Sequence, residues 1–459
     1  MRRIAQRAWA LVVLMALLLG GTLFFLGDYA CNASWWVSYR GSPHLSSSGL
    51  NNATVVGRSG AVLMTMGGGT RYAEQQAVRK SLVHWLGDRE GKILAPAVSE
   101  YADEMSGYNP ITGLYAFSET SGEIALTLSA SLQETALKAM GDKRGVIAVY
   151  NYKTGEILCA VSAPNYDPDD PPKLTEEELN SNEAYDGLYW NRFTRSTYSP
   201  GSIFKVVTTA AALETIDDIQ EQTFQCTGKV KYGPDAVTCE KAHGKVNLKQ
   251  ALAKSCNCAF AQIAEELGKE TLEKYVDKFG VVEGLSFDGV TTRAGNFDLK
   301  KAADVEVAWA AIGQYTDLIN PASYMTFLGT IAGGGTAAEP YVVKAVTRGD
   351  DTVYEASVTK TDRTMSRDTA EILQELMANN VTVSYGAYNF PGLTVCAKSG
   401  TSQQGGDKTS NALFAGFVAD EEYPLAFIVV VEGGGYGAST CVPIISKVLA
   451  ACKAEIDQY

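Results

Sequence analysis

The first strong pattern along the chain is an apolar run without charged residues, from Ala8 to Gly27. About 20 such residues match the thickness of the hydrocarbon core of a bilayer, so the run predicts a membrane-spanning helix. Arg2, Arg3 and Arg7 precede it, and the positive-inside rule places them in the cytoplasm and the rest of the chain outside. The alternative is a cleaved signal peptide. Such a peptide has a shorter apolar core, about 7–15 residues, and a small-x-small cleavage site, which the residues fit poorly.

Residues 1–30 therefore form a cytoplasmic stub and anchor, and Tyr29, Trp35 and Trp36 fall where an interfacial aromatic belt is expected. Residues 31–120 are rich in Gly, Ser and Asn, with short alternating runs such as "ATVVGRSGAVLMTM". One helix is predicted here, "RYAEQQAVRKSLVHWLG", which ends at Gly87. This segment is interpreted as a small irregular membrane-proximal module.

The pattern changes at about residue 121, where the third segment, 121–459, begins. "GEIALTLSASLQETALKAM" predicts a strand that runs into a helix started by Ser131, and "GVIAVYNYKTGEILCAVS" predicts a hairpin of two apolar strands. Residues 202–335 are mainly helical in pattern. "LTVCAKSGT" predicts a strand, "NALFAGFVADEEYPLAFIVVV" a second hairpin, and residues 438–455 a final helix. Strands at both ends with helices between them predict an α+β fold, in which an antiparallel sheet from N- and C-terminal segments carries an inserted helical lobe.

Charge narrows the possible partners. The formal net charge of -13 argues against nucleic acid, because phosphate binding requires clustered Lys and Arg. The same acidity disfavours electrostatic binding to anionic lipid, so contact with the cytoplasmic membrane is left to the N-terminal helix.

The cysteines predict no disulfide scaffold, because nine of them are spread over a long chain. Cys226 and Cys239 could pair across a short segment, and the sequence leaves this open. Cys256-x-Cys258 resembles half of a metal site, but zinc requires about four ligands with a second cluster nearby. The chain has only three histidines, and His243 is interpreted as a structural residue, so we expect no metal or other cofactor.

One break in the chain places two reactive side chains together. In "STYSPGSIFKVVTTAAALE", Pro200 and Gly201 interrupt the chain and a run of good helix formers follows. Ser202 falls at or just before the first turn, and Lys205 is its i+3 neighbour on the same face. A hydroxyl beside an amine can be a nucleophile with its base, or a helix cap beside a surface lysine.

Two similar motifs elsewhere in the chain lack a supporting context. The S-x-x-K at residues 357–360 lies in a polar, β-branched stretch with no helix after it. The K-T-G at residues 153–155 falls on the predicted hairpin turn, where glycine serves turn geometry. Both are interpreted as structural.

Three motifs occur in a recognisable order: Ser202-Ile-Phe-Lys205, Ser255-Cys-Asn257 and Lys398-Ser-Gly400 followed by Thr401. With the stretches around them, over about residues 121–459, they resemble the penicillin-recognising serine transferases, and among these the class B penicillin-binding proteins. Residues 28–120 match that family only faintly and are shorter than its usual pedestal. The resemblance implies the penicillin-binding transpeptidase fold.

Chemistry and resemblance together assign expected roles. Ser202 is the expected nucleophile and Lys205 its general base, which requires that burial and the positive charge of Lys398 lower the pKa of Lys205. Ser255 is expected to relay the proton, and Asn257 to bind the backbone of the donor peptide. Cys256, the middle residue of its motif, is interpreted as a small buried filler.

The resemblance also implies how the acyl group is bound. The backbone N–H groups of Ser202 and Thr401 are expected to form the oxyanion hole. Lys398, with the hydroxyls of Ser399 and Thr401, is expected to bind the terminal carboxylate of the donor. A side chain at Gly400 is expected to crowd the approach of substrate.

The expected activity is therefore a serine-type peptidoglycan D,D-transpeptidase that cross-links stem peptides and is acylated by β-lactams. The resemblance implies a single-pass protein of the bacterial cell membrane with an extracytoplasmic catalytic domain and a membrane glycan polymerase as partner. The alternatives are a D,D-carboxypeptidase, a membrane-tethered β-lactamase, or a β-lactam sensor. The sequence leaves open the acceptor amine, the growth process served, and the oligomeric state.

Overall fold

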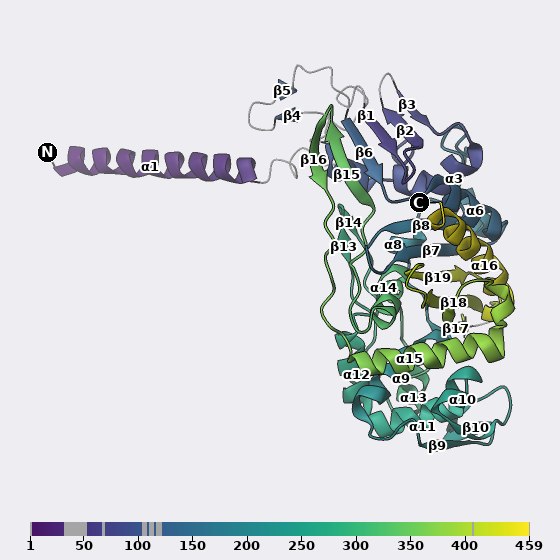
Figure 1. Cartoon of the computed structure of the whole chain (residues 1–459). Coiled ribbons are helices and arrows are strands. Elements are labelled where there is room, and N and C mark those ends of the chain that lie inside the picture. The colour runs from purple at the N-terminus through teal and green to yellow at the C-terminus, as the bar shows by residue number, and fades with distance from the viewer. Residues whose placement is uncertain are drawn as a thin grey trace.

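The computed structural model describes residues 2–31, 53–66, 69–102, 108–109, 114–115, 122–405 and 408–458. Helix α1 (Arg2–Cys31) stands apart from all other elements in Figure 1. Its segment Arg7–Tyr29 has a mean hydropathy of 2.5, is not buried by the rest of the chain, and is long and apolar enough to cross a membrane. Trp35 and Trp36, expected in an aromatic belt, lie outside the described residues.

A five-stranded antiparallel sheet forms the centre of the third segment, residues 121–459, in the order β17-β18-β19-β7-β8. Its strands come from both ends of that segment: β7 (Gly145–Asn151), β8 (Ile157–Ala163), β17 (Val395–Ser402), β18 (Asn411–Val418) and β19 (Leu425–Val431). Both predicted hairpins and the predicted strand are thereby confirmed. Strand β17, which carries Lys398, lies at the edge of the sheet.

Both faces of this sheet are covered by helices, which is why its strands are almost wholly apolar. Alternate residues of β7 supply two separate cores: Ile147 and Val149 pack with α6 (Ala130–Met140) and α16 (Gly437–Ile456), while Val146 and Ala148 join the core of the helical lobe. The final helix was predicted at nearly these bounds. Helix α6 begins earlier than expected, because its cap is Ser129, which precedes the predicted Ser131.

The helical lobe fills residues between the two halves of the sheet, as predicted, and its helices α9–α13 lie at the opposite end of Figure 1 from β1–β3. Its helices and turns are α8 (Arg192–Arg195), η2 (Gly201–Phe204), α9 (Lys205–Thr215), α10 (Leu248–Ala253), α11 (Asn257–Leu267), α12 (Lys269–Lys278), α13 (Asp304–Ala310), α14 (Pro321–Ala332), α15 (Arg367–Asn380), η3 (Val381–Tyr385) and η4 (Ala387–Asn389). The same stretch of sequence forms strand pairs that were not predicted: β9 (Thr223–Cys226) with β12 (Gly244–Asn247), β10 (Lys229–Tyr232) with β11 (Asp235–Thr238), and β13 (Ser286–Phe287) with β14 (Val290–Thr291). The last of these pairs lies near β15 in Figure 1, away from the other two. Helix α7 (Glu176–Ser181) and the turn η1 (Glu183–Tyr185) precede the lobe.

The membrane-proximal segment is more regular than the sequence indicated. Three of its strands join a six-stranded mixed sheet in the order β16-β15-β6-β1-β2-β3. The strands are β1 (Ala53–Val56), β2 (Val62–Met66), β3 (Thr70–Tyr72), β6 (Gly122–Leu126), β15 (Val343–Arg348) and β16 (Asp351–Glu355). The sheet therefore combines strands from both sides of residue 120, and the domain boundary placed there stays a prediction.

The predicted helix of the same segment is confirmed as α3 (Gln76–Leu86), which ends at Gly87 in a left-handed conformation with φ 74°. The short helix α4 (Pro96–Glu100) and the strand pair β4 (Tyr108–Asn109) and β5 (Leu114–Tyr115) complete the described part of this segment.

Candidate active site

Ser202 lies in η2, the short 3₁₀ turn that leads directly into α9. Gly201 before it has a φ of 52°, a left-handed conformation that glycine adopts without strain. The turn places Ser202 one helical turn before Lys205, and the Lys205 Nζ atom lies 3.0 Å from Ser202 Oγ. The two side chains are thus within hydrogen-bonding distance, as their spacing predicted. A helix cap with a surface lysine is excluded, because Lys205 is fully buried.

Lys205 is surrounded by oxygen atoms of the Ser255-Cys-Asn257 motif. Its Nζ lies 3.0 Å from Ser255 Oγ, 2.9 Å from the Ser255 carbonyl oxygen and 2.6 Å from Asn257 Oδ1. An ammonium has three protons to donate, fewer than the four oxygens present when Ser202 is counted. A neutral amine at this position could instead accept the proton of the Ser202 hydroxyl.

Ser255 connects the two lysines of the site. It lies between α10 and α11 with a φ of 52°, an unusual left-handed conformation for a residue with a side chain. Its hydroxyl lies 3.0 Å from Lys205 Nζ and 3.1 Å from Lys398 Nζ. Such backbone strain costs about 1–3 kcal/mol and is characteristic of positions where function demands one geometry.

Burial gives both lysines unusual proton affinities. Burial, reinforced by the charge of Lys398, lowers the pKa of Lys205 well below its ordinary value, and the neighbouring thiol groups of Cys239, Cys256 and Cys258 act weakly in the opposite direction. Burial alone lowers the pKa of Lys398 to about 7. A lysine can therefore be neutral at this site near physiological pH, as base chemistry requires.

Close backbone contacts hold β17 against the turn that carries the nucleophile. A Cβ atom at Gly400 would lie 2.7 Å from the Pro200 carbonyl oxygen, and one at Gly201 would lie 2.5 Å from the Thr401 carbonyl oxygen. We expected Gly400 to keep the approach of substrate open. The structure gives Gly400 a further role, the close packing of β17 on η2, and its role in substrate approach stays a prediction.

The hydroxyls expected beside Lys398 have other partners. Ser399 Oγ and its backbone N–H both donate to the hydroxyl of Tyr385, at 3.0 and 2.9 Å. Thr401 Oγ1 accepts from the N–H of Gly437 at 3.3 Å. Asn257 is also engaged, since its Nδ2 donates to the Thr238 carbonyl oxygen at 2.7 Å. The substrate contacts assigned to these three side chains stay predictions.

The sequence did not predict that Tyr385 would contact Ser399 or that Thr238 would contact Asn257. Tyr385 ends η3, a π-helical turn, a feature often found at functional sites. Neither residue belongs to a motif, and no local pattern signals their approach to Ser399 and Asn257.

An ion pair supports the loop before the nucleophile. Arg192 Nε donates to Glu432 Oε1 at 2.8 Å, and the Tyr198 hydroxyl donates to the same oxygen at 2.9 Å. Asn191 caps α8 by accepting from the N–H of Phe193 at 3.1 Å. Glu432, which follows β19, thus ties the loop to the central sheet.

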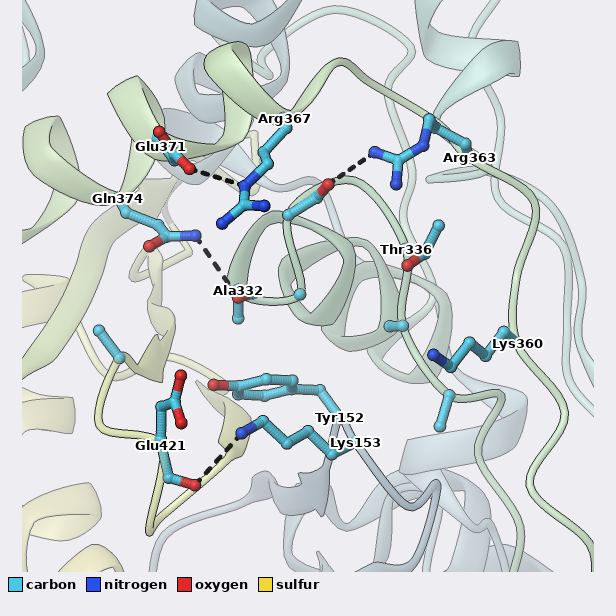
Figure 2. A pocket seen from close by; sticks show the side chains of 15 residues that line it. Tyr152, Lys153, Ala332, Thr336, Lys360, Arg363, Arg367, Glu371, Gln374 and Glu421 are labelled. Carbon is cyan, nitrogen blue, oxygen red and sulfur yellow. Dashed lines mark hydrogen bonds and ion pairs between the residues drawn. The ribbon is translucent and has the colours of Figure 1, made fainter.

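The two similar motifs elsewhere are separate from this site. Lys153 of the K-T-G turn and Lys360 of the second S-x-x-K both line a different pocket of about 630 Å³, drawn in Figure 2. Arg363, Arg367 and Glu371 line the same pocket, and the three motif segments of the site contribute no lining residue. Residues 356–359 form no helix, and residues 153–155 form the hairpin turn, so both structural interpretations are confirmed.

The open question of the Cys226–Cys239 pair is answered by the geometry, in which both thiols are free. Cys239 Sγ instead lies 3.8 Å from Cys256 Sγ.

The fold and a serine–lysine pair completed by a second serine and a second lysine define a serine acyltransferase of the penicillin-recognising type. Residues 145–450 match the model of the penicillin-binding protein transpeptidase domain. This chain therefore belongs to that family, as a class B penicillin-binding protein.

Its similarity to characterised relatives extends over most of the chain. The peptidoglycan D,D-transpeptidase PbpA of Mycolicibacterium smegmatis is 29% identical over 368 residues, which cover 73% of each chain. Stage V sporulation protein D of Bacillus subtilis is 28% identical over 398 residues, or 82% of this chain and 58% of that protein. Penicillin-binding protein A of M. tuberculosis, in a ceftriaxone acyl-enzyme complex, superposes with a TM-score of 0.76 at 22% identity, over 89% of this chain and 99% of that chain.

Proposed function

We propose that this protein is a peptidoglycan D,D-transpeptidase that cross-links stem peptides through an acyl-Ser202 intermediate and is inhibited by β-lactams. The observation that carries the proposal is the 3.0 Å contact between Ser202 Oγ and the buried Lys205 Nζ. A lysine in this setting can be neutral, and only a neutral amine can take the proton of the serine.

In the acylation step, neutral Lys205 accepts the proton of Ser202 as Oγ attacks the carbonyl carbon of the penultimate D-Ala. The backbone N–H groups of Ser202 and Thr401 stabilise the oxyanion. The C–N bond then breaks, and the leaving D-Ala amine takes a proton delivered from Lys205 through Ser255. This transfer is short, because Ser255 Oγ lies 3.0 Å from Lys205 Nζ.

In the second step, the amine of a neighbouring stem attacks the acyl-serine carbonyl and forms the cross-link. Ser255 and Lys205 take the proton of this amine, and the Ser202 hydroxyl is restored. The protonated form of Lys398 binds the terminal carboxylate of the donor, with the Ser399 and Thr401 hydroxyls beside it, and Asn257 binds the donor backbone.

The N-terminal helix supports a setting at the cell membrane, with the catalytic segment outside the cytoplasm. The arginines that precede the apolar run argue for this topology. A membrane glycan polymerase is the proposed partner, since a transpeptidase needs nascent glycan strands. Related proteins do assemble with others: penicillin-binding protein 2 of Helicobacter pylori, which superposes with a TM-score of 0.63 at 23% identity over 72% of this chain and 64% of that chain, was solved in complex with MreC.

The test is to incubate the detergent-solubilised full chain with a donor peptide ending in D-Ala-D-Ala and a peptide amine acceptor, and to analyse products by mass spectrometry. We expect a cross-linked product and released D-Ala, both absent with Ser202→Ala. Hydrolysed donor without cross-linked product would favour the carboxypeptidase. Absence of both products, with the folded wild-type chain, would overturn the proposal.

A further inference from the structure

A cluster of sulfur and nitrogen atoms includes the middle residue of the Ser255-Cys-Asn257 motif. Cys226, Cys239, His243 and Cys256 each direct one ligand atom into it, and these four atoms all lie within 4.8 Å of one another. We propose that this cluster, the Cys₃His cluster, binds one zinc ion that holds the catalytic motif in place. The sequence led us to expect no metal, because no second ligand pair adjoins Cys256-x-Cys258 along the chain.

Two of the distances in the Cys₃His cluster match a tetrahedral zinc site, and all four ligand atoms lie within 4.8 Å of one another. Zn–S bonds of about 2.3 Å and Zn–N bonds of about 2.0 Å, arranged as a tetrahedron, separate the ligand atoms by about 3.5–3.8 Å. Cys239 Sγ and Cys256 Sγ are 3.8 Å apart, and Cys226 Sγ and His243 Nδ1 are 3.6 Å apart. Soft thiolates with one imidazole in tetrahedral geometry select zinc over calcium or magnesium. Binding requires each thiol to release its proton to solvent.

Backbone N–H groups already donate to two of the sulfur atoms in the cluster. The N–H of His243 donates to Cys226 Sγ at 3.4 Å, and the N–H of Cys258 donates to Cys239 Sγ at 3.3 Å. Hydrogen bonds from the surroundings to the ligands orient them and are a regular part of metal sites. A disulfide is the alternative, but it requires an S–S distance of about 2.05 Å, far below the separation of Cys239 and Cys256.

The four ligands come from three parts of the lobe that no strand pairing joins to one another. Cys226 ends β9, Cys239 follows β11, His243 precedes β12, and Cys256 precedes α11. The pairs β9–β12 and β10–β11 are separate two-stranded sheets with many exposed residues. Both pairs bury apolar side chains in the core of the lobe, such as Val237 and Val246, and a metal that joins both pairs to α11 would add a cross-link between them.

The Cys₃His cluster reaches the catalytic motif through two adjacent residues. Cys256 stands between Ser255 and Asn257, and its position fixes both neighbours. Asn257 Nδ2 donates to the carbonyl oxygen of Thr238, the residue before Cys239. A metal bound to Cys239 and Cys256 would therefore clamp this contact and keep the Ser255 hydroxyl between the two lysines. The ligands act as positioning residues, not catalytic ones.

The first test is the metal content of the detergent-solubilised full chain after loading with Zn²⁺ and removal of the excess. We expect about one zinc per chain for the wild type, and less than about a tenth for His243→Ala and for Cys226→Ala. His243→Cys restores a four-thiolate set and should retain zinc. Cys441→Ala is the matched control, because Cys441 is a buried thiol of α16 in the other core. It should bind zinc like the wild type.

Replacement of zinc by Co²⁺ gives a second readout, because tetrahedral thiolate coordination produces intense visible absorption that the ligand variants should lose. The link to catalysis predicts that His243→Ala slows acylation by benzylpenicillin about tenfold or more, and His243→Cys much less. Zinc retained by His243→Ala would overturn the proposal, as would a wild type that takes up no zinc or holds a disulfide within the cluster. Zinc content and Co²⁺ absorption do not depend on transpeptidase activity. A failure of the proposed function would therefore leave the zinc proposal standing, and the two failures can be told apart.

Discussion

At the scale of residues, the site depends on two buried lysines with different tasks. The motif spacing alone predicted that Ser202 and Lys205 would meet, because residues three apart on a helix are neighbours. It could not predict that Tyr385 would take up the Ser399 hydroxyl or that Thr238 would bind Asn257. These contacts join segments far apart in sequence, so no local pattern reveals them. The same is true of the Cys₃His cluster.

The proton affinities of the two lysines predict a bell-shaped pH profile for acylation by benzylpenicillin. Acylation falls at low pH as Lys205 becomes protonated, at a pKa well below that of an ordinary lysine. It falls again as pH rises through about 7, because Lys398 loses the charge that binds the carboxylate of the drug. The check is the second-order rate of acylation, measured by mass spectrometry from about pH 4 to about pH 10, a range that extends to both sides of the Lys398 pKa of about 7.

Benzylpenicillin methyl ester is the control for this profile, since it has no carboxylate charge for Lys398 to bind. It should react more slowly but lose the alkaline limb. An alkaline limb of the same midpoint for drug and ester would contradict the role of Lys398.

At the scale of elements, hairpins and helices were predictable because their apolar periodicity is local. The strands β7, β8, β18 and β19 are buried runs bounded by turns, and such runs identify themselves. The six-stranded sheet was not predictable, because β1 pairs with β6 and β6 with β15 over long stretches of chain. Its strands are short, and their composition does not indicate which strand each of them pairs with.

The contact between β17 and η2 predicts that Gly201→Ala impairs acylation strongly. Its Cβ would meet the Thr401 carbonyl oxygen at 2.5 Å and push β17 away from Ser202. We expect the benzylpenicillin acylation rate to fall about 100-fold, as misplacement of a catalytic group by about 1 Å can cause. Gly141→Ala is the matched control, since Gly141 has a φ of 56° but open space around it. Equal losses in both variants would show that backbone strain and not the contact is responsible.

The ion pair between Arg192 and Glu432 predicts a loss of stability when one partner is removed. Arg192→Ala removes the buried partner of Glu432 and leaves it only the more exposed Arg144, at 3.2 Å, so we expect the free energy of unfolding to fall by about 3 kcal/mol. Arg367→Ala removes an exposed ion pair with Glu371 and should cost less than about 1 kcal/mol. Denaturant unfolding of the three chains provides the comparison, and similar losses for both variants would contradict the bracing role of Arg192.

At the scale of the whole molecule, the described chain consists of one apolar helix, the membrane-proximal strands and helices, and one catalytic segment. The helix was predictable from composition, because its length and lack of charge match a bilayer. The relation between the membrane-proximal strands and the catalytic segment required the structure, which places them in a shared sheet.

Membrane attachment is predicted to depend on α1 alone. Full-length protein expressed in bacteria should stay with the membrane fraction after alkaline carbonate extraction, whereas a variant without residues 2–31 should be released. Replacement of the apolar run by an unrelated membrane-spanning helix is the control and should restore attachment. A truncated chain that resists extraction would reveal a second membrane contact.

The most direct test of stable acylation at Ser202 is the intact mass of the full chain after incubation with benzylpenicillin, followed for hours. We expect one drug per chain, stable over that time, on a peptide that contains Ser202, and no adduct on Ser202→Ala. An adduct on another residue, or one that disappears within seconds as the drug is hydrolysed, would contradict this expectation.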